Sequence, residues 1–187
     1  MREDVIKEIE RFTPSCEQEK ECKLKAIEYL KSESGDPFVR DNFNGHFTSG
    51  ALVVSSDNMI LLNHHKKSGM WFQFGGHCDG DTDLLNSAKR EVYEESGLKD
   101  EDLVGLVDGI FNIDIQLIPD NETKGEGEHL HYDINYLLLT KNKDFTMSDE
   151  SFSIKWCTID EARSLIDKSD IGTLRMIEKF EKMVKEK

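Results

Sequence analysis

Three glutamates that fall within five consecutive residues, Glu91, Glu94 and Glu95, are the side chains of this sequence best suited to chemistry. On a helix, residues three and four positions apart lie on one face, so the three carboxylates would converge. Like charges at this spacing oppose each other, and the negative end of the helix dipole adds to the cost. Mg²⁺ would offset this cost, because it prefers carboxylate oxygens and water. The spacing therefore predicts a metal site, with a solvated acidic face as the alternative.

The residues around the glutamates favour the metal site. A glycine pair ending at Gly76 precedes an expected helix at residues 83–96, and Arg90 stands directly before Glu91. Gly97 follows the helix at a position where a left-handed residue is preferred. This context distinguishes the segment from an arbitrary acidic run, so we expect the helix to carry a functional site.

The stretch from Gly76 to Leu98 resembles the Nudix box of the Nudix hydrolases. That box joins a glycine to the segment Arg-Glu-aliphatic-any-Glu-Glu-any-Gly-aliphatic, with a further glutamate between them. Eight positions of this sequence fall in register: Gly76, Arg90, Glu91, Val92, Glu94, Glu95, Gly97 and Leu98. The family's further glutamate falls on Thr82. Either Thr82 or Asp81 caps the helix, or Asp81 takes the place of the missing glutamate.

The resemblance implies an α/β fold, the α/β/α sandwich of the family with a mixed sheet. It implies hydrolysis of a pyrophosphate bond in a nucleoside diphosphate linked to another group, with Mg²⁺ or Mn²⁺ as cofactor. Glu91, Glu94 and Glu95 are the implied catalytic metal ligands, and the carbonyl oxygen of Gly76 is a further one. Arg90 is expected to orient a glutamate rather than touch the substrate. The general base varies within the family, and Glu91 is only a candidate.

A second set of polar residues alternates along an expected strand. His129, His131 and Asp133 are separated by apolar residues, so they share one face while the apolar residues face the core. This face predicts a substrate-binding wall or a second metal site, and an exposed polar strand face is the alternative. His77 directly follows Gly76, as in a subgroup of the family whose box begins Gly-Gly-His-any-Asp, and is a further candidate for substrate binding.

Two more candidates for substrate binding, Trp71 and Gln73, lie on the short strand expected at residues 71–74. They share one face of that strand, and Phe72 and Phe74 share the other. One pair must belong to the core. Trp71 could stack on a base, although a buried tryptophan is an equally good interpretation.

The strands and helices expected to position these residues alternate irregularly along the chain. We expect an N-terminal helical appendage at residues 1–36 and a Nudix-like catalytic domain at residues 37–187. Apolar patterns predict strands at 51–54, 59–62, 111–117, 130–136 and 153–157, a polar loop at 121–128, and helices beginning near 158 and 174. Hairpins together with crossovers predict a mixed sheet with helices on both faces.

Composition narrows the range of partners. The net charge of −14 argues against a broad nucleic-acid surface, which needs basic residues. The sequence contains no run of about 18 apolar residues, so we expect no membrane span. The charged start does not resemble a signal peptide. We expect a cytoplasmic protein whose partner is a small, nucleotide-like diphosphate. A homodimer is possible, although no sequence signature indicates one.

Two other functions fit part of the pattern. An enzyme like isopentenyl diphosphate isomerase shares the implied fold but needs a cysteine poised for proton transfer to carbon, and Cys78 beside the glycine pair is the candidate. A non-catalytic nucleotide-binding sensor could have lost turnover along with the glutamate that Thr82 replaces. A sensor, however, has no need for three converging carboxylates.

Overall fold

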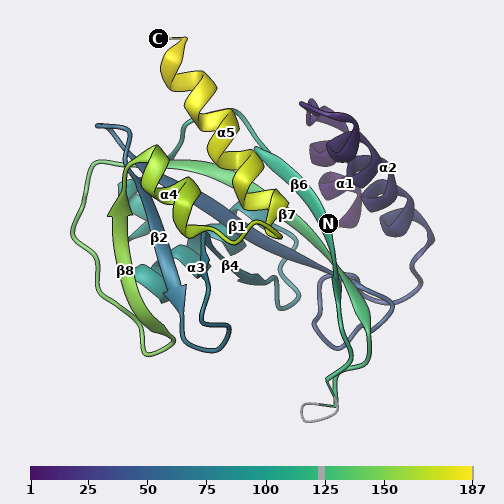
Figure 1. The fold of residues 1–187 in the computed structure, drawn as a ribbon. Helices are drawn as coiled ribbons and strands as arrows, with labels where there is room; N and C mark the ends of the chain where they lie inside the picture. Colours follow the sequence, from purple (N-terminus) through teal and green to yellow (C-terminus); the bar gives the residue numbers. More distant parts are fainter. Residues whose placement is uncertain (122–124, 187) are drawn as a thin grey trace.

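The computed structural model describes residues 1–121 and 125–186 (Figure 1). The expected loop at 121–128 therefore lies partly outside the described residues. The first half of the chain comprises α1 (Arg2–Arg11), α2 (Glu17–Ser32), β1 (His46–Ser55), β2 (Ile60–His65), β3 (Trp71–Phe72), β4 (Phe74–His77) and α3 (Leu84–Ser96). The second half comprises a 3₁₀ turn (Asp100–Asp102), β5 (Leu103–Gly105), β6 (Asn112–Ile118), β7 (His129–Thr140), β8 (Ser151–Cys157), α4 (Ile159–Leu165) and α5 (Ile171–Lys185).

The strands of the described residues form one eight-stranded mixed sheet. Its main path is β3-β2-β1-β7-β5, while β4 also pairs with β1, β6 with β7, and β8 with β2. β1 and β7 run parallel, with His46 opposite His131 at one end and Ser55 opposite Thr140 at the other. The remaining strand pairs are antiparallel. This arrangement confirms the predicted mixed sheet with helices on both faces.

Alternation along β1 divides the core between the two faces of the sheet. Phe47, Ala51 and Val53 pack into a cluster with apolar residues of α1, α2 and α3. Leu52 and Val54 pack on the other face with residues of α4 and α5. Figure 1 shows α4 and α5 in front of the sheet and α3 behind it. β1 is therefore buried on both faces, which explains why its four consecutive residues 51–54 are all apolar.

The N-terminal helices share their core with α3. Val5 and Ile9 of α1 and Ala26 and Leu30 of α2 are almost completely buried in the same cluster as Phe47. The division of the chain into an appendage at 1–36 and a domain at 37–187 remains a prediction. Among the described residues, no helix is both long and apolar enough to cross a membrane.

Two local predictions about the strands were incomplete. The strand expected at 71–74 is interrupted at Gln73, so that β3 pairs with β2 while β4 pairs with β1. Strand β5, at Leu103–Gly105, was not predicted, because three residues are too few to show a period. The helix predicted to begin near 158 does so through a capping box between Thr158 and Glu161.

Candidate active site

The start of α3 is built by two aspartates. Asp83 is the N-cap, and its carboxylate accepts a hydrogen bond from the Asn86 backbone N–H at 3.0 Å. Asp81 accepts from the Asp83 backbone N–H and from the Asn86 side chain, both at 2.9 Å. Thr82 Oγ1 accepts from the amino group of Met1 at 3.2 Å. The expectation that Thr82 or Asp81 caps the helix is therefore wrong, and both oxygens of Asp81 are engaged in supporting the helix start.

Glu91 is held against the glycine strand. A Cβ added at Gly76 would lie 2.5 Å from Glu91 Oε2, so only glycine leaves room for this carboxylate beside β4. Arg90 donates to Glu91 Oε1 at 2.7 Å and to the backbone carbonyl of His77 at 2.7 Å. The Arg90 guanidinium also lies 3.5 Å from Glu94. Arg90 thus fixes Glu91 on β4 and balances part of its charge.

Glu95 is fixed by two donors from the sheet. Asn63 of β2 donates to Glu95 Oε1 at 3.0 Å, and the Gly75 backbone N–H donates to Oε2 at 3.2 Å. Burial raises the pKa of Glu95 to about 7. Burial likewise raises the pKa of Glu91, and the nearby charge of Glu94 adds to the shift although Arg90 opposes it. The site therefore concentrates carboxylates whose ionisation a cation would favour.

The opposite side of β4 faces a group of histidines. The Gly76 Cα faces Glu91, so the next side chain, His77, points to the other face of the sheet. There it lies near His46 of β1 and His131 of β7, with ring centroids 5.1 and 5.3 Å away. His129 Nε2 lies 3.1 Å from His131 Nε2. The polar face of β7 is thus half-buried among ring side chains rather than an exposed face.

Comparison with known proteins assigns the chain to a family. A family model described as the NUDIX domain matches residues 46–180. The chain belongs to the NUDIX domain family. A probable DHNTP pyrophosphohydrolase of Lactococcus lactis subsp. cremoris (strain MG1363) is 29% identical over 152 residues, which cover 81% of this chain and 87% of that protein.

Solved structures show the same NUDIX fold. A C. elegans Ap4A hydrolase in a binary complex has a TM-score of 0.57 and 21% identity, covering 75% of this chain and 99% of that one. The E. coli dihydroneopterin triphosphate pyrophosphohydrolase has a TM-score of 0.58 and 15% identity, covering 72% and 93%. At these identities the likeness concerns the fold alone.

The NUDIX carboxylates fit a hard divalent cation. When Glu91, Glu94 and Glu95 are ionised, the Arg90 guanidinium balances one of their charges and two remain. Mg²⁺ prefers such oxygen donors. The contact between Gly76 and Glu91 also agrees with a metal site. Gly76 leaves room for the Glu91 carboxylate beside β4, whereas any larger residue would displace an oxygen of that carboxylate.

Asp133, Trp71 and Gln73, the remaining predicted residues of this NUDIX chain, contact side chains other than the three glutamates. Asp133 accepts from Thr48 Oγ1 at 2.8 Å, on the histidine face of the sheet. Trp71 stacks on His64 with ring centroids 4.8 Å apart, and it packs against the α4–α5 core. Gln73 accepts a hydrogen bond from Thr173 of α5. The structure therefore gives Trp71 and Gln73 packing partners of their own, and their assignment to substrate binding stays a prediction.

Two residues escaped the sequence analysis. Asn63 positions Glu95, and its signal was a polar residue inside the apolar run of β2. His46 was given no role, because only the parallel pairing of β1 with β7 brings it to His131. A parallel pairing between distant strands leaves no local mark in a sequence.

Proposed function

We propose that this chain is a divalent-metal-dependent pyrophosphohydrolase that cleaves a phosphoanhydride bond of a nucleotide-like substrate. The observation that carries the proposal is the convergence of Glu91 and Glu95 of α3 on the Gly75–Gly76 backbone. Neither carboxylate is paired with a lysine of residues 1–121 or 125–186, and Arg90 is shared between Glu91 and Glu94. Such a site suits a cation that in turn binds phosphate.

Each residue of the box then has a definite task. Glu91, Glu94 and Glu95, together with the carbonyl oxygen of Gly76, would hold Mg²⁺ or Mn²⁺. When bound, the metal would polarise phosphoryl oxygens and lower the pKa of a coordinated water. Arg90 is a positioning residue, since it holds Glu91 against β4 and contacts the His77 carbonyl. Rate enhancement would come mainly from orientation and charge neutralisation.

The class of substrate follows from the relatives only as a proposal. The Lactococcus lactis relative and the E. coli structural neighbour are both described as acting on dihydroneopterin triphosphate, and the C. elegans neighbour on Ap4A. These compounds share a phosphoanhydride chain attached to a heterocyclic group. We therefore extend the expected substrates from nucleoside diphosphates linked to another group to include a pterin triphosphate.

The isomerase alternative loses its main support in the structure. Cys78 is 1% exposed, and burial raises the pKa of its thiol to about 12. A thiol in that position packs into the core cluster rather than facing a ligand. It is therefore poorly placed to exchange a proton with a substrate carbon.

The test is hydrolysis of a panel comprising dihydroneopterin triphosphate, Ap4A, ADP-ribose, nucleotide sugars and nucleoside triphosphates. Each compound is assayed with Mg²⁺, with Mn²⁺ and with chelator. We expect metal-dependent cleavage of a phosphoanhydride bond in at least one compound, detected by separating its phosphorylated products and reduced about 100-fold or more in Glu95→Gln. Glu101→Gln is the matched control, because that side chain is 79% exposed and lies outside the box.

The sensor alternative predicts a different pattern. Substrates would bind in the presence of metal without being hydrolysed, and Thr82→Glu would raise a rate close to zero. Equal hydrolysis by wild type and Glu95→Gln would contradict the assignment of the carboxylates itself.

A further inference from the structure

The histidines on the far side of β4 form a compact group of ring nitrogens. His46 lies opposite His131 in the parallel β1–β7 ladder, and His77 lies opposite Thr48, the next residue of β1 on that face. One ring nitrogen from each of the three histidines lies within 4.8 Å of the other two. Two nitrogens bound to one Zn²⁺ lie roughly 3.4 Å apart, given Zn–N distances of about 2.0–2.1 Å. Modest side-chain rotations would close that difference.

The deepest of these histidines has a ring nitrogen without a hydrogen-bond partner among the described residues. His46 is 1% exposed, and its Nδ1 lies 3.2 Å from the backbone carbonyl of Asn42. A hydrogen bond from Nδ1 to a carbonyl leaves the lone pair on Nε2. That Nε2 atom is buried and has no hydrogen-bond partner among residues 1–121 and 125–186. A buried acceptor without a partner is unfavourable, and a metal ion would supply one.

The rings are also in the form that metals bind. Burial is the largest cause that lowers the pKa of His46, that of His77 to about 4 and that of His131 to about 3, and the charge of Arg40 lowers the pKa of His77 further. The imidazoles are therefore neutral near pH 7. Neutral imidazole is the ligand form, so no proton must be displaced when a metal ion enters.

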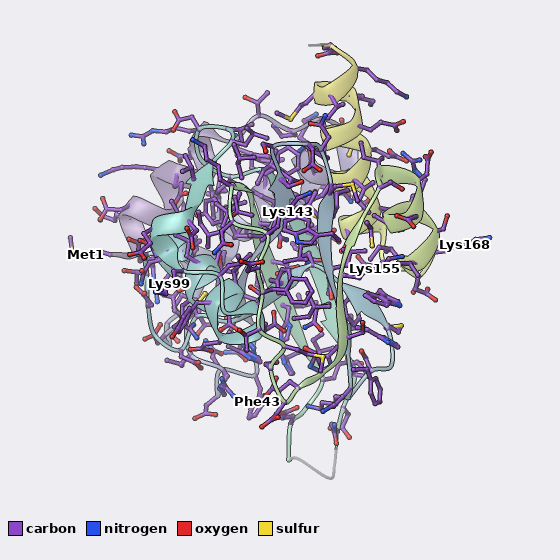
Figure 2. The ribbon with its side chains drawn as sticks, turned by 90° about the vertical axis from the view of Figure 1, so that its left-hand side faces the viewer. Met1, Phe43, Lys99, Lys143, Lys155 and Lys168 are labelled. Atoms are coloured by element: carbon purple, nitrogen blue, oxygen red, sulfur yellow. The ribbon has the colours of Figure 1, made fainter. Side chains whose placement is uncertain are left out.

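A fourth histidine supports the group from outside. His129 Nδ1 lies 2.6 Å from the Gly127 carbonyl, and its Nε2 lies 3.1 Å from His131 Nε2. Phe43, labelled at the lower end of the molecule in Figure 2, packs edge-on against His129 with centroids 5.7 Å apart. His129 is thus a positioning residue for His131, of the kind that commonly surrounds metal ligands.

We propose that His46, His77 and His131 form a second metal site that binds a divalent transition-metal ion such as Zn²⁺. Imidazole nitrogens select zinc and its neighbours over Mg²⁺, which prefers oxygen. The site lies on the face of the sheet opposite Glu91, and His77 connects it to the carboxylate site through Gly76. Three histidine ligands leave a coordination position open for water or a ligand atom. The proposal does not depend on the hydrolase activity.

The test uses Co²⁺ as a spectroscopic probe for Zn²⁺. Metal-free full-length protein is titrated with Co²⁺ in excess Mg²⁺, which occupies the carboxylates. We expect one equivalent to bind with visible d–d bands, and Zn²⁺ to displace it. His77→Gln and His131→Ala should each weaken binding about 100-fold or more, and His129→Ala about 10–100-fold.

Two matched variants make the result specific. His65→Ala removes a histidine that lies near Glu150 instead, so Co²⁺ binding should be unchanged. Glu95→Gln should also leave it unchanged, which separates this proposal from the carboxylate site. Thermal melts in chelator check that each variant is folded. No saturable Co²⁺ binding in Mg²⁺, a thiolate charge-transfer band, or binding lost in Glu95→Gln but kept in both histidine variants would overturn the proposal.

Discussion

The Glu95 carboxyl is buried between Asn63 and the Gly75 backbone, and its pKa is raised from 4.5 to about 7. In metal-free protein between these two pH values, the folded state binds more protons at Glu95 than the unfolded state does. The free energy of unfolding must then fall as the pH rises through this window. Ionisation of the buried Glu95 carboxyl thus lowers the stability of the metal-free protein, and a bound cation would offset the charge that causes this loss.

We predict that, in chelator, wild type loses about 1–3 kcal/mol more stability between pH 5 and pH 8 than Glu95→Gln does. The buried histidines shift stability in the opposite direction, so the difference between the two proteins isolates Glu95. Urea denaturation at each pH gives the free energies. Parallel pH profiles for wild type and Glu95→Gln would contradict the prediction, and Glu101→Gln, a variant of an exposed side chain, should follow wild type.

At the scale of elements, the approach of α3 to β4 depends on Gly76. An alanine there would place its Cβ 2.5 Å from Glu91 Oε2, so the helix face and the strand must separate or the carboxylate must rotate away. We predict that Gly76→Ala reduces metal-dependent hydrolysis about 100-fold or more, while overpacking costs about 1–3 kcal/mol of stability. Steady-state kinetics with Mg²⁺ and a thermal melt measure the two effects.

The control for this prediction is Gly127→Ala. A Cβ added at Gly127 meets no atom of the described residues within 4 Å, so hydrolysis and stability should both stay near wild type. If Gly76→Ala retained normal hydrolysis, the contact between Gly76 and Glu91 would not be needed for the proposed activity.

Elements with local signals could be predicted from the sequence, and those defined by distant pairing could not. The bounds of α3 were expected within one residue, because Gly97 adopts the left-handed conformation that a glycine permits, with φ of 70°. Periodicity also indicated that β6 and β7 are strands, although the buried Asn112 and Asp114 and the exposed Leu117 show that burial along β6 does not follow its apolar alternation. The alternation of side chains specifies a face but no partner strand.

The same limit applied to the candidate site. The carboxylates could be found because one helix carries them at fixed spacing. The histidine group could be found only in part, since His77, His131 and His46 come from three strands whose order no local pattern reveals. The partners of Trp71 and Gln73 on β2 and α5 likewise left no local mark in the sequence, and the assignment of these two residues to substrate binding stays a prediction.

At the scale of the whole molecule, buried charges join the two ends of the chain beside β6, where Figure 1 shows α2 and α5 on either side. Glu19 of α2 is 0% exposed, accepts from Lys179 Nζ at 2.9 Å and lies 4.0 Å from Arg175. Arg175 lies 3.7 Å from Asp114 of β6. Removing the Glu19 charge would leave Lys179 without this partner and Arg175 with Asp114 alone, which is costlier than breaking an exposed pair.

We therefore predict that Glu19→Gln lowers the free energy of unfolding by about 2–4 kcal/mol. Glu17→Gln, at a side chain that is 72% exposed and pairs with Lys20, should change it by no more than about 0.5 kcal/mol. Urea denaturation followed by both tryptophan fluorescence and circular dichroism measures the two values. Because α1 and α2 share a core with α3, both signals should report one transition in wild type. An earlier loss of helix alone would instead support an appendage at 1–36 that unfolds separately, and equal stabilities of the two variants would show that the Glu19 contacts do not hold the ends together.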